Sequence, residues 1–134
     1  MWIALIMMVW AGQEAPSLQS RIERMIWKNR IVLVYAPEEE SDLLRAQKDI
    51  LTSQPAELTD RDIVVIECVK DRLSMKDQGY LIRQFQSKPE AFGVWLIGKD
   101  GDLKLQSEHP VSMDKLMGLI DSMPMRRAEM KRHN

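Results

Sequence analysis

The residues best suited to chemistry in this sequence are one cysteine, an acidic cluster and a Met-Pro-Met-Arg-Arg segment. Cys68 is the only cysteine, so the chain can form neither an internal disulfide nor a CxxC redox pair. A lone thiol acts as a nucleophile when a helix N-terminus or a basic neighbour lowers its pKa. Cys68 instead follows Glu67 in an apolar run, with Lys70 as the offsetting charge nearby. This context favours a small buried hydrophobe over a nucleophile, and both interpretations stay open.

The acidic cluster consists of Glu38, Glu39, Glu40 and Asp42. Its carboxylates could hold a hard cation such as calcium, but the cluster lacks the alternation and the glycine of known calcium loops. Acids next to a capping serine also suit the positive end of a helix dipole. The cluster therefore predicts a solvated helix start that can double as a binding surface, and we expect no metal there.

The Met-Pro-Met-Arg-Arg segment places Met123, Met125, Arg126 and Arg127 around one proline. A helix stop needs only the proline, so the other four residues call for an explanation of their own. They could form a docking surface in which the methionines adapt to a partner and the arginines meet its carboxylates or sulfates. They could equally be structural, with the methionines over the core and the arginines on helix carbonyls or on the acidic cluster. Both interpretations remain open at this point.

Composition limits the class of protein. The chain has 134 residues, 45% of them hydrophobic and 29% charged, which is typical of one globular domain. Its 19 basic and 20 acidic residues nearly cancel, so no overall field attracts nucleic acid. His109 and His133 have no metal-ligand spacing with each other or with the cysteine. The glycine-rich residues 98–102 are explained by a hairpin turn rather than by a phosphate cradle. We expect neither a metal nor another cofactor.

The N-terminus carries an apolar run. Residues 1–11 are too few to cross a bilayer, which takes about 20 residues, but they have the length of the apolar core of a signal peptide. No Lys or Arg precedes the run. Residues 12–17 are polar and resemble a linker. We expect an export signal, and hence a periplasmic or secreted mature chain without a membrane span; without that signal the chain would be cytoplasmic.

The first half of the body alternates helix and strand patterns. Apolar runs of β-forming residues at 31–35 and 63–69 predict strands that are covered on both faces. Apolar residues at helical spacing predict one helix from residue 18 to near residues 28–30 and another from the cap Ser41 to just before Pro55. A right-handed crossover through the second helix makes the two strands parallel.

The second half begins with a polar stretch, residues 71–78, which we expect to be a loop before a short helix over 80–85. Residues 92–97 predict a third strand, which a turn joins to a half-exposed strand at 103–105. Ser112 caps a last helix, and Pro124 ends it. Residues 131–134 are then a basic tail. Trp27 and Trp95 fall within these elements and are expected in the core.

This order, βαβ followed by a helix, a β-hairpin and a C-terminal helix, resembles the thioredoxin plan, an α/β three-layer sandwich. Three segments carry a closer resemblance: WKNR at 27–30, FGVWLIGKDG at 92–101 and IDSMPMRR at 120–127. They are similar to segments of the domain of unknown function 4174 family. That family is found in bacterial proteins, in sushi-repeat-containing proteins of animals and in a related extracellular coiled-coil-domain protein. The resemblance covers residues 18–130.

The resemblance implies a thioredoxin-like domain, closest to the peroxiredoxins, often exported and without a settled activity. Thioredoxins carry their cysteines in the loop after the first strand, where the helix N-terminus stabilises a thiolate. The corresponding residues here, 37–42, are mostly acidic, and Gly93 stands at the position of the usual cis-proline. The usual redox site is therefore replaced, not merely stripped of sulfur.

Three functional hypotheses follow. The first is a non-catalytic, exported interaction module that binds an unidentified macromolecule through the acidic cluster and the Met-Pro-Met-Arg-Arg segment. The second is a peroxiredoxin-like oxidoreductase that uses Cys68 with an external thiol. The third is a domain that binds acidic or sulfated polymers through Arg126 and Arg127.

Overall fold

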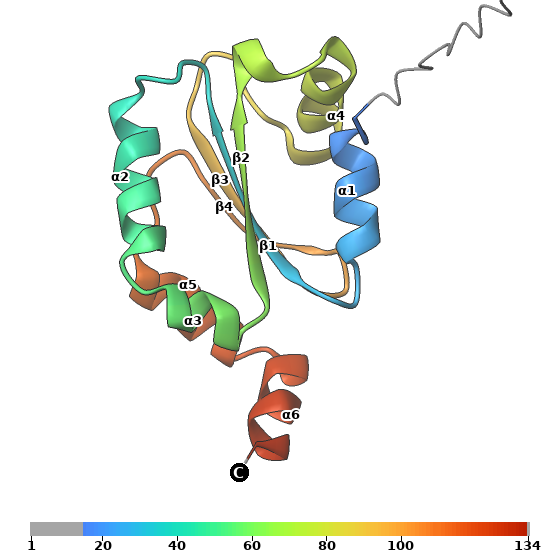
Figure 1. Cartoon of the computed structure of the whole chain (residues 1–134), viewed down its shortest axis with the longest axis vertical. Coiled ribbons are helices and arrows are strands. Elements are labelled where there is room, and N and C mark those ends of the chain that lie inside the picture. Colours follow the sequence, from blue (N-terminus) through green and yellow to red (C-terminus); the bar gives the residue numbers. More distant parts are fainter. Residues whose placement is uncertain (1–14, 134) are drawn as a thin grey trace, which may run out of the picture.

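The protein is built around a four-stranded sheet, shown in Figure 1 from a computed structural model that describes residues 15–133. The strand order is β2-β1-β3-β4, with β1 parallel to β2 and antiparallel to β3, and β4 antiparallel to β3. The strands are β1 (Arg30–Ala36), β2 (Ile63–Val69), β3 (Gly93–Ile97) and β4 (Leu103–Ser107). The parallel pair and the hairpin are both as predicted, and β1 is central.

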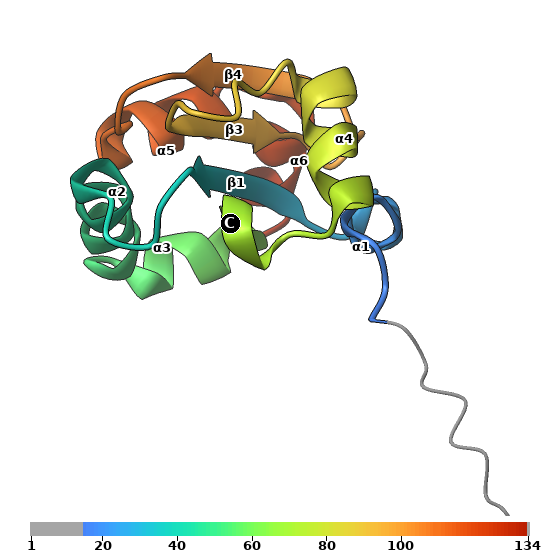
Figure 2. The ribbon, with the colours of Figure 1, turned by 90° about the horizontal axis from the view of Figure 1, so that it is seen from above.

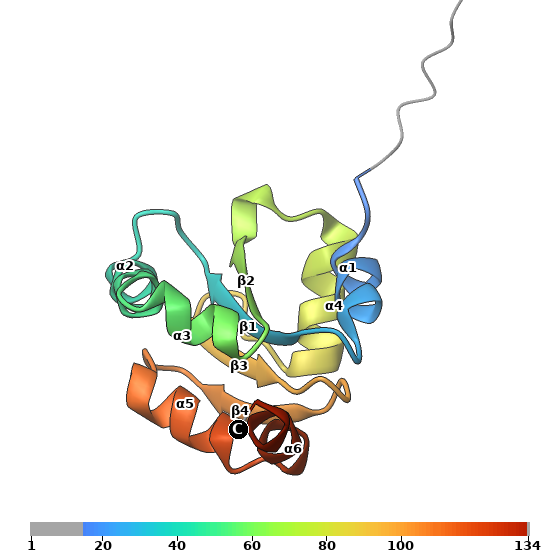
Figure 3. The same ribbon diagram turned by 60° about the horizontal axis from the view of Figure 1, so that its bottom comes forward.

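Helices cover both faces of the sheet, which confirms the predicted three layers (Figure 2). The first layer holds α2 (Asp42–Thr52), α3 (Pro55–Asp60) and α5 (Met113–Asp121). The second layer holds α1 (Leu18–Met25) and α4 (Met75–Phe85). A last helix, α6 (Pro124–Arg132), lies at one end of the molecule, beyond α5 (Figure 3).

The core is divided by β1, whose seven residues are all buried. Val32 and Val34 face the layer of α2 and α5, whereas Ile31 and Leu33 face the layer of α1 and α4. Successive side chains of a strand point to opposite faces, so the part of a strand that has helices on both sides is apolar at consecutive positions. This is why residues 31–35 show no alternation of apolar and polar residues.

The edge strand β2 departs from the prediction of two covered faces. Ile66 and Cys68 face the layer of α1 and α4 and are buried, whereas Val65 and Glu67 are exposed on the opposite face. The layer of α2 covers that face only partly, so an unbroken apolar run did not mean burial on both sides.

The helix α4 begins earlier than predicted. Residues 71–78 were expected to be a loop, but only Lys70–Arg72 forms a short 3-10 turn before α4 starts at Met75. Ser74 caps the helix by accepting a hydrogen bond from the Asp77 N–H at 3.1 Å. The first turns of α4 bury few side chains, so their sequence carried little helical periodicity.

Two prolines that we interpreted as helix stops also begin helices. Pro55 opens α3 and Pro124 opens α6, each in the first turn, where a missing backbone N–H costs nothing. Because α6 runs to Arg132, the first two residues of the expected tail at 131–134 belong to a helix. The predicted export signal, residues 1–11, lies outside the described residues. Among residues 15–133 no helix combines the length and apolarity needed to cross a membrane.

Candidate functional site

Cys68 is a buried member of the sheet. Its side chain is 2% exposed on β2, packed in the cluster that α1 and α4 form with the sheet. Burial raises the pKa of the thiol to about 12, with smaller contributions in the same direction from Asp77 and Glu67; Arg21 acts in the opposite direction. The thiol lies within a strand and not at a helix N-terminus. Burial therefore outweighs the one charge, that of Arg21, which would stabilise a thiolate here.

The acidic cluster forms the connection from β1 to α2. Ser41 accepts a hydrogen bond from the Leu44 N–H at 3.3 Å, so it is the predicted cap. The acids point to solvent, where Asp42 pairs with Arg45 and Glu39 with Arg72. Within residues 15–133 no set of His, Cys, Asp or Glu side chains gathers as metal ligands would. Exposed ion pairs of this kind contribute little to stability.

The Met-Pro-Met-Arg-Arg segment links α5 to α6 and divides between two environments. Arg126 is buried, 5% exposed, and donates to the Asp60 carboxylate from Nη2 at 2.6 Å and to that of Asp121 from Nε at 3.2 Å. Arg127 is exposed. The two arginines therefore do not act as one basic surface, and the partners of Arg126 are not the acidic cluster.

The acidic cluster and this segment lie at opposite ends of the sheet (Figure 1). The cluster follows Ala36, the last residue of β1, whereas α6 pairs with Arg30, the first. Seven strand residues at about 3.3 Å each separate them by roughly 20 Å. The residues predicted to bind are therefore two separate surfaces.

The helix α6 is attached mainly by charge. Its one buried side chain is that of Arg126. Glu129 accepts hydrogen bonds from both Nη atoms of Arg30, at 3.2 and 3.3 Å, and from Lys99 Nζ at 2.6 Å. Burial tends to raise the pKa of Glu129, but the hydrogen bonds from Lys99 and Arg30 outweigh it, and the pKa lies below its usual range.

A second ion pair joins α3 to the end of α5. Arg61 donates to both oxygens of Asp121, from Nε at 2.9 Å and from Nη2 at 2.8 Å. This planar, bidentate contact is the geometry that a guanidinium group favours. The hydrogen bond from Arg61, with help from Arg126, lowers the pKa of Asp121. Arg61 and Arg126 thus both donate to the carboxylate of Asp121, close to the start of α6.

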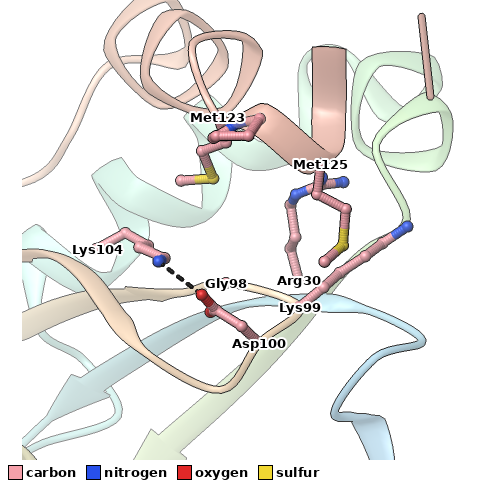
Figure 4. Close-up of a pocket in the computed structure, with 8 residues that line it drawn as sticks. Arg30, Gly98, Lys99, Asp100, Lys104, Met123 and Met125 are labelled. Carbon is pink, nitrogen blue, oxygen red and sulfur yellow. Dashed lines mark hydrogen bonds and ion pairs between the residues drawn. The ribbon is translucent and has the colours of Figure 1, made fainter. Parts of the chain in front are cut away.

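A cavity of about 200 Å³ lies beneath the segment between α5 and α6 (Figure 4). Its roof is formed by residues 123–125. Opposite the roof lie residues 98–99 and the side chains of Asp100 and Lys104, whose Oδ2 and Nζ atoms are 2.9 Å apart. Arg30 stands between them. Its side chain is 1% exposed, and its Nε is buried without a hydrogen-bond partner. The cavity has an apolar roof, and the guanidinium of Arg30, one of its lining residues, keeps one buried N–H unpaired.

Trp27 lies close to this cavity and is not in the core. Its side chain is 67% exposed, and its backbone has a φ of 70° in the turn between α1 and β1. Its N–H donates to the Lys99 carbonyl at 2.6 Å, which places that turn beside the turn between β3 and β4. We call the surface where residues 27–30, 98–104 and 123–127 meet the α6 end. The three segments that resemble the family converge there.

The sequence interpretation missed Arg30, Lys99 and Glu129. The available signals were an arginine directly before a buried strand and the polar run Lys-Asn-Arg at 28–30. Neither signal indicates which acidic residue pairs with Arg30, because its partner Glu129 is 99 residues away along the chain.

Gly93 has a packing role in this structure. A Cβ at this position would fall within 3.0 Å of three ring atoms of Trp95. The indole of Trp95 is buried, 2% exposed, and donates to the Phe85 carbonyl at 3.0 Å. Among the described residues there is no cis peptide bond. The position that we matched to the cis-proline is therefore occupied by Gly93, against which the ring of the buried Trp95 packs.

Comparison with solved structures identifies the class of fold. The chain superposes on the reduced 2-Cys peroxiredoxin of Plasmodium vivax with a TM-score of 0.59 and 11% identity, over 79% of this chain and 83% of that one. For Plasmodium yoelii thioredoxin peroxidase I the TM-score is 0.59 and the identity 14%, over 79% of each chain. The fold is thus thioredoxin-like. At this identity the likeness extends to the fold alone.

Sequence comparison identifies the family. Residues 21–129 match the domain of unknown function DUF4174, and the chain belongs to that family, as its resemblance indicated. It is 33% identical over 138 residues to coiled-coil domain-containing protein 80 of Danio rerio. The alignment covers 85% of this chain and 16% of that protein, so the chain spans a small part of this relative.

Proposed function

We propose that this thioredoxin-like domain is a non-catalytic binding module that performs no thiol chemistry. The observation that carries the proposal is the burial of Cys68, with a thiol pKa of about 12. At pH 7 that pKa leaves a thiolate fraction of about 10⁻⁵, against about 0.03 for an ordinary cysteine of pKa 8.5. The loop that holds the reactive thiols of thioredoxins carries acids instead, and their charge disfavours an anion.

The test compares this proposal with a single-cysteine oxidoreductase. A thiol-reactive dye at pH 7 should label native Cys68 at least about 10³-fold more slowly than the same chain unfolded in urea. Peroxide should produce no sulfenic acid, and Cys68→Ser should consume peroxide no more slowly than the unmodified chain. Rapid native labelling, or peroxide consumption lost in the variant, would establish the oxidoreductase.

The α6 end is the surface that we propose for a macromolecular partner. It supplies an exposed tryptophan, the residue type most enriched at interface hot spots, and two methionines that can adapt to a partner. The acidic cluster at the other end stays a separate predicted surface. A photoreactive amino acid at position 27 should form one cross-linked product that excess unmodified domain suppresses. The same probe at Met75, which is 82% exposed on α4, is the matched control; equal products from both positions would contradict the assignment.

The third hypothesis, binding of sulfated polymers, receives less support, because Arg126 is occupied by Asp60 and Asp121. Export remains part of the proposal on the basis of residues 1–11. Mass spectrometry of the chain expressed with its own N-terminus in a bacterial host should find a shortened periplasmic product. An intact cytoplasmic chain would refute export without affecting the binding role.

A further inference from the structure

We propose that the edge strand β2 pairs with β2 of a second copy of this chain, so that the two sheets join across a two-fold axis into one continuous sheet. This surface is separate from the α6 end, and the pairing is independent of the binding role proposed there. Three features of β2 carry it, namely its outward backbone groups, the lack of protection along its edge and its complementarity to itself.

The outer edge of β2 has no strand partner within residues 15–133, where β1 is its one neighbour. Figure 1 shows β2 in front of the other strands. The N–H of Arg30 donates to the carbonyl of Asp62 at 3.0 Å. This bond fixes the phase of the parallel ladder, because alternate residues of a strand bond to the same neighbour. The backbone groups that point away from β1 are therefore those of Ile63, Val65, Glu67 and Val69.

The edge of β2 lacks the features that keep exposed edges apart, whereas the opposite edge of the sheet has them. Proteins protect edge strands by short length, charged residues, prolines and bulges. The strand β4 has five residues, includes Lys104 and pairs with β3 in an interrupted register. The strand β2 has seven residues, pairs with β1 without interruption and has Glu67 as its one charged residue. Its Val65 is 38% exposed. An edge of this kind is a template for another strand.

An antiparallel pairing centred on Ile66 makes this edge complementary to itself. Two outward-facing residues must lie opposite each other in each hydrogen-bonded pair. This centre meets that condition along the whole of β2 and sets Val65 opposite Glu67 of the second copy. A pairing centred on Glu67 would bring two like charges face to face, which destabilises an antiparallel pair. A pairing centred on Val65 would leave Cys68 and Val69 opposite residues that lie outside β2.

The charges around the edge agree with this register. Glu67 pairs with Lys48 of α2 at 3.3 Å, so the one charge within the strand is balanced. The residues that flank β2 are Asp62 and Lys70, and the register brings each of them towards the other in the second copy. Both already belong to ion pairs within the chain, so no charge is left without a partner where they meet. The ends of the paired strands therefore attract each other.

The test is the mass of the full chain in sedimentation equilibrium from about 1 µM to about 1 mM, which covers the affinities of weak complexes. We expect the mass to double reversibly from 15.6 kDa as the concentration rises. The N–H groups of Val65 and Glu67 should exchange slowly with deuterium oxide only where the dimer forms, because each then donates to the second copy. A monomer at every concentration would overturn the inference. So would slow exchange of these two groups in a monomer, because another segment of the same chain would then cover the edge.

Three substitutions at Val65 separate this pairing from association elsewhere. Val65→Pro removes an outward N–H and should abolish the dimer, while an edge strand tolerates proline where its N–H faces solvent. Val65→Glu sets a like charge opposite Glu67 on each side of the two-fold axis and should raise the dissociation constant about tenfold. Val65→Lys presents the opposite charge to the same glutamate and should bind at least as tightly as the unmodified chain.

The matched control is Leu103→Glu on β4, because Leu103 is 43% exposed at the other edge of the sheet. It should leave the dissociation constant unchanged, and circular dichroism verifies that each variant is folded. Equal weakening by Val65→Glu and Val65→Lys would contradict the register. Loss of the dimer in Leu103→Glu, with Val65→Glu unaffected, would place the contact on β4 and overturn the inference.

Discussion

Replacing Glu129 with alanine would test whether charge, and not apolar packing, holds α6 on the domain. Glu129 is 14% exposed and is the carboxylate that pairs with Arg30, which is 1% exposed. Removing one partner of a buried ion pair costs about 3–5 kcal/mol, because the other charge stays buried without compensation. Arg30 keeps its hydrogen bond to the Arg61 carbonyl, so we expect the low end, about 3 kcal/mol of unfolding free energy.

The assay is urea unfolding at pH 7, followed by circular dichroism. With a urea m-value of about 2 kcal/mol/M, the expected loss lowers the unfolding midpoint by about 1.5 M. Glu129→Gln keeps an acceptor oxygen without the charge and should lose less than the alanine variant. The matched control is Glu39→Ala, which removes an exposed ion pair with Arg72 and should change stability by at most about 0.5 kcal/mol.

A loss below about 1 kcal/mol for Glu129→Ala would refute this reasoning. It would show that Arg30 finds water or another acceptor once the carboxylate is gone, and that α6 does not depend on the ion pair. A loss equal to that of Glu39→Ala would have the same meaning.

Three further predictions follow. The pKa values of Glu129 and Asp121 lie below their usual range, so the folded state binds fewer protons than the unfolded state near pH 4. The free energy of unfolding should therefore be at its full value above about pH 5 and should fall as the pH drops through the folded pKa values. This fall should be less steep in Glu129→Gln, which lacks one of the two carboxylates. Gly93→Ala should cost about 2 kcal/mol in urea unfolding, because its Cβ meets the buried Trp95 ring; a neutral result would mean that the ring moves freely. Trp27→Gly should not lower the calorimetric Tm, because Trp27 is 67% exposed and has a φ of 70°, a conformation that glycine adopts without strain. A clear drop in Tm would show that the Trp27 side chain contributes to the packed core.

The elements predicted correctly are those with local causes. The strands β1, β2 and β3 were found because consecutive β-forming apolar residues identify them. The caps Ser41 and Ser112 were found because each serine oxygen serves an N–H three residues away, in Leu44 and Lys115. The start of α4 and the helix α6 were missed, since neither buries a regular apolar stripe.

The candidate site was predictable only in part. The neighbours of Cys68 along the chain correctly favoured burial, which the structure confirms. The Met-Pro-Met-Arg-Arg segment was recognised as unusual, but its two arginines could not be told apart by sequence. Arg126 turns inward because Asp60, 66 residues away, and Asp121 receive it. Arg127, one residue further along the helix, faces solvent.

The sequence by itself determined that this is an α/β domain with one cysteine, hence without an internal pair of thiols, and with an acidic helix start after its first strand. These properties depend on residue counts and on patterns a few residues long. Only the tertiary structure decided that Arg30, Lys99 and Glu129 form the attachment of α6, and that a cavity lies beside them. Ion pairs and cavities of this kind join residues that are distant along the chain, and no short-range pattern specifies which charges will meet.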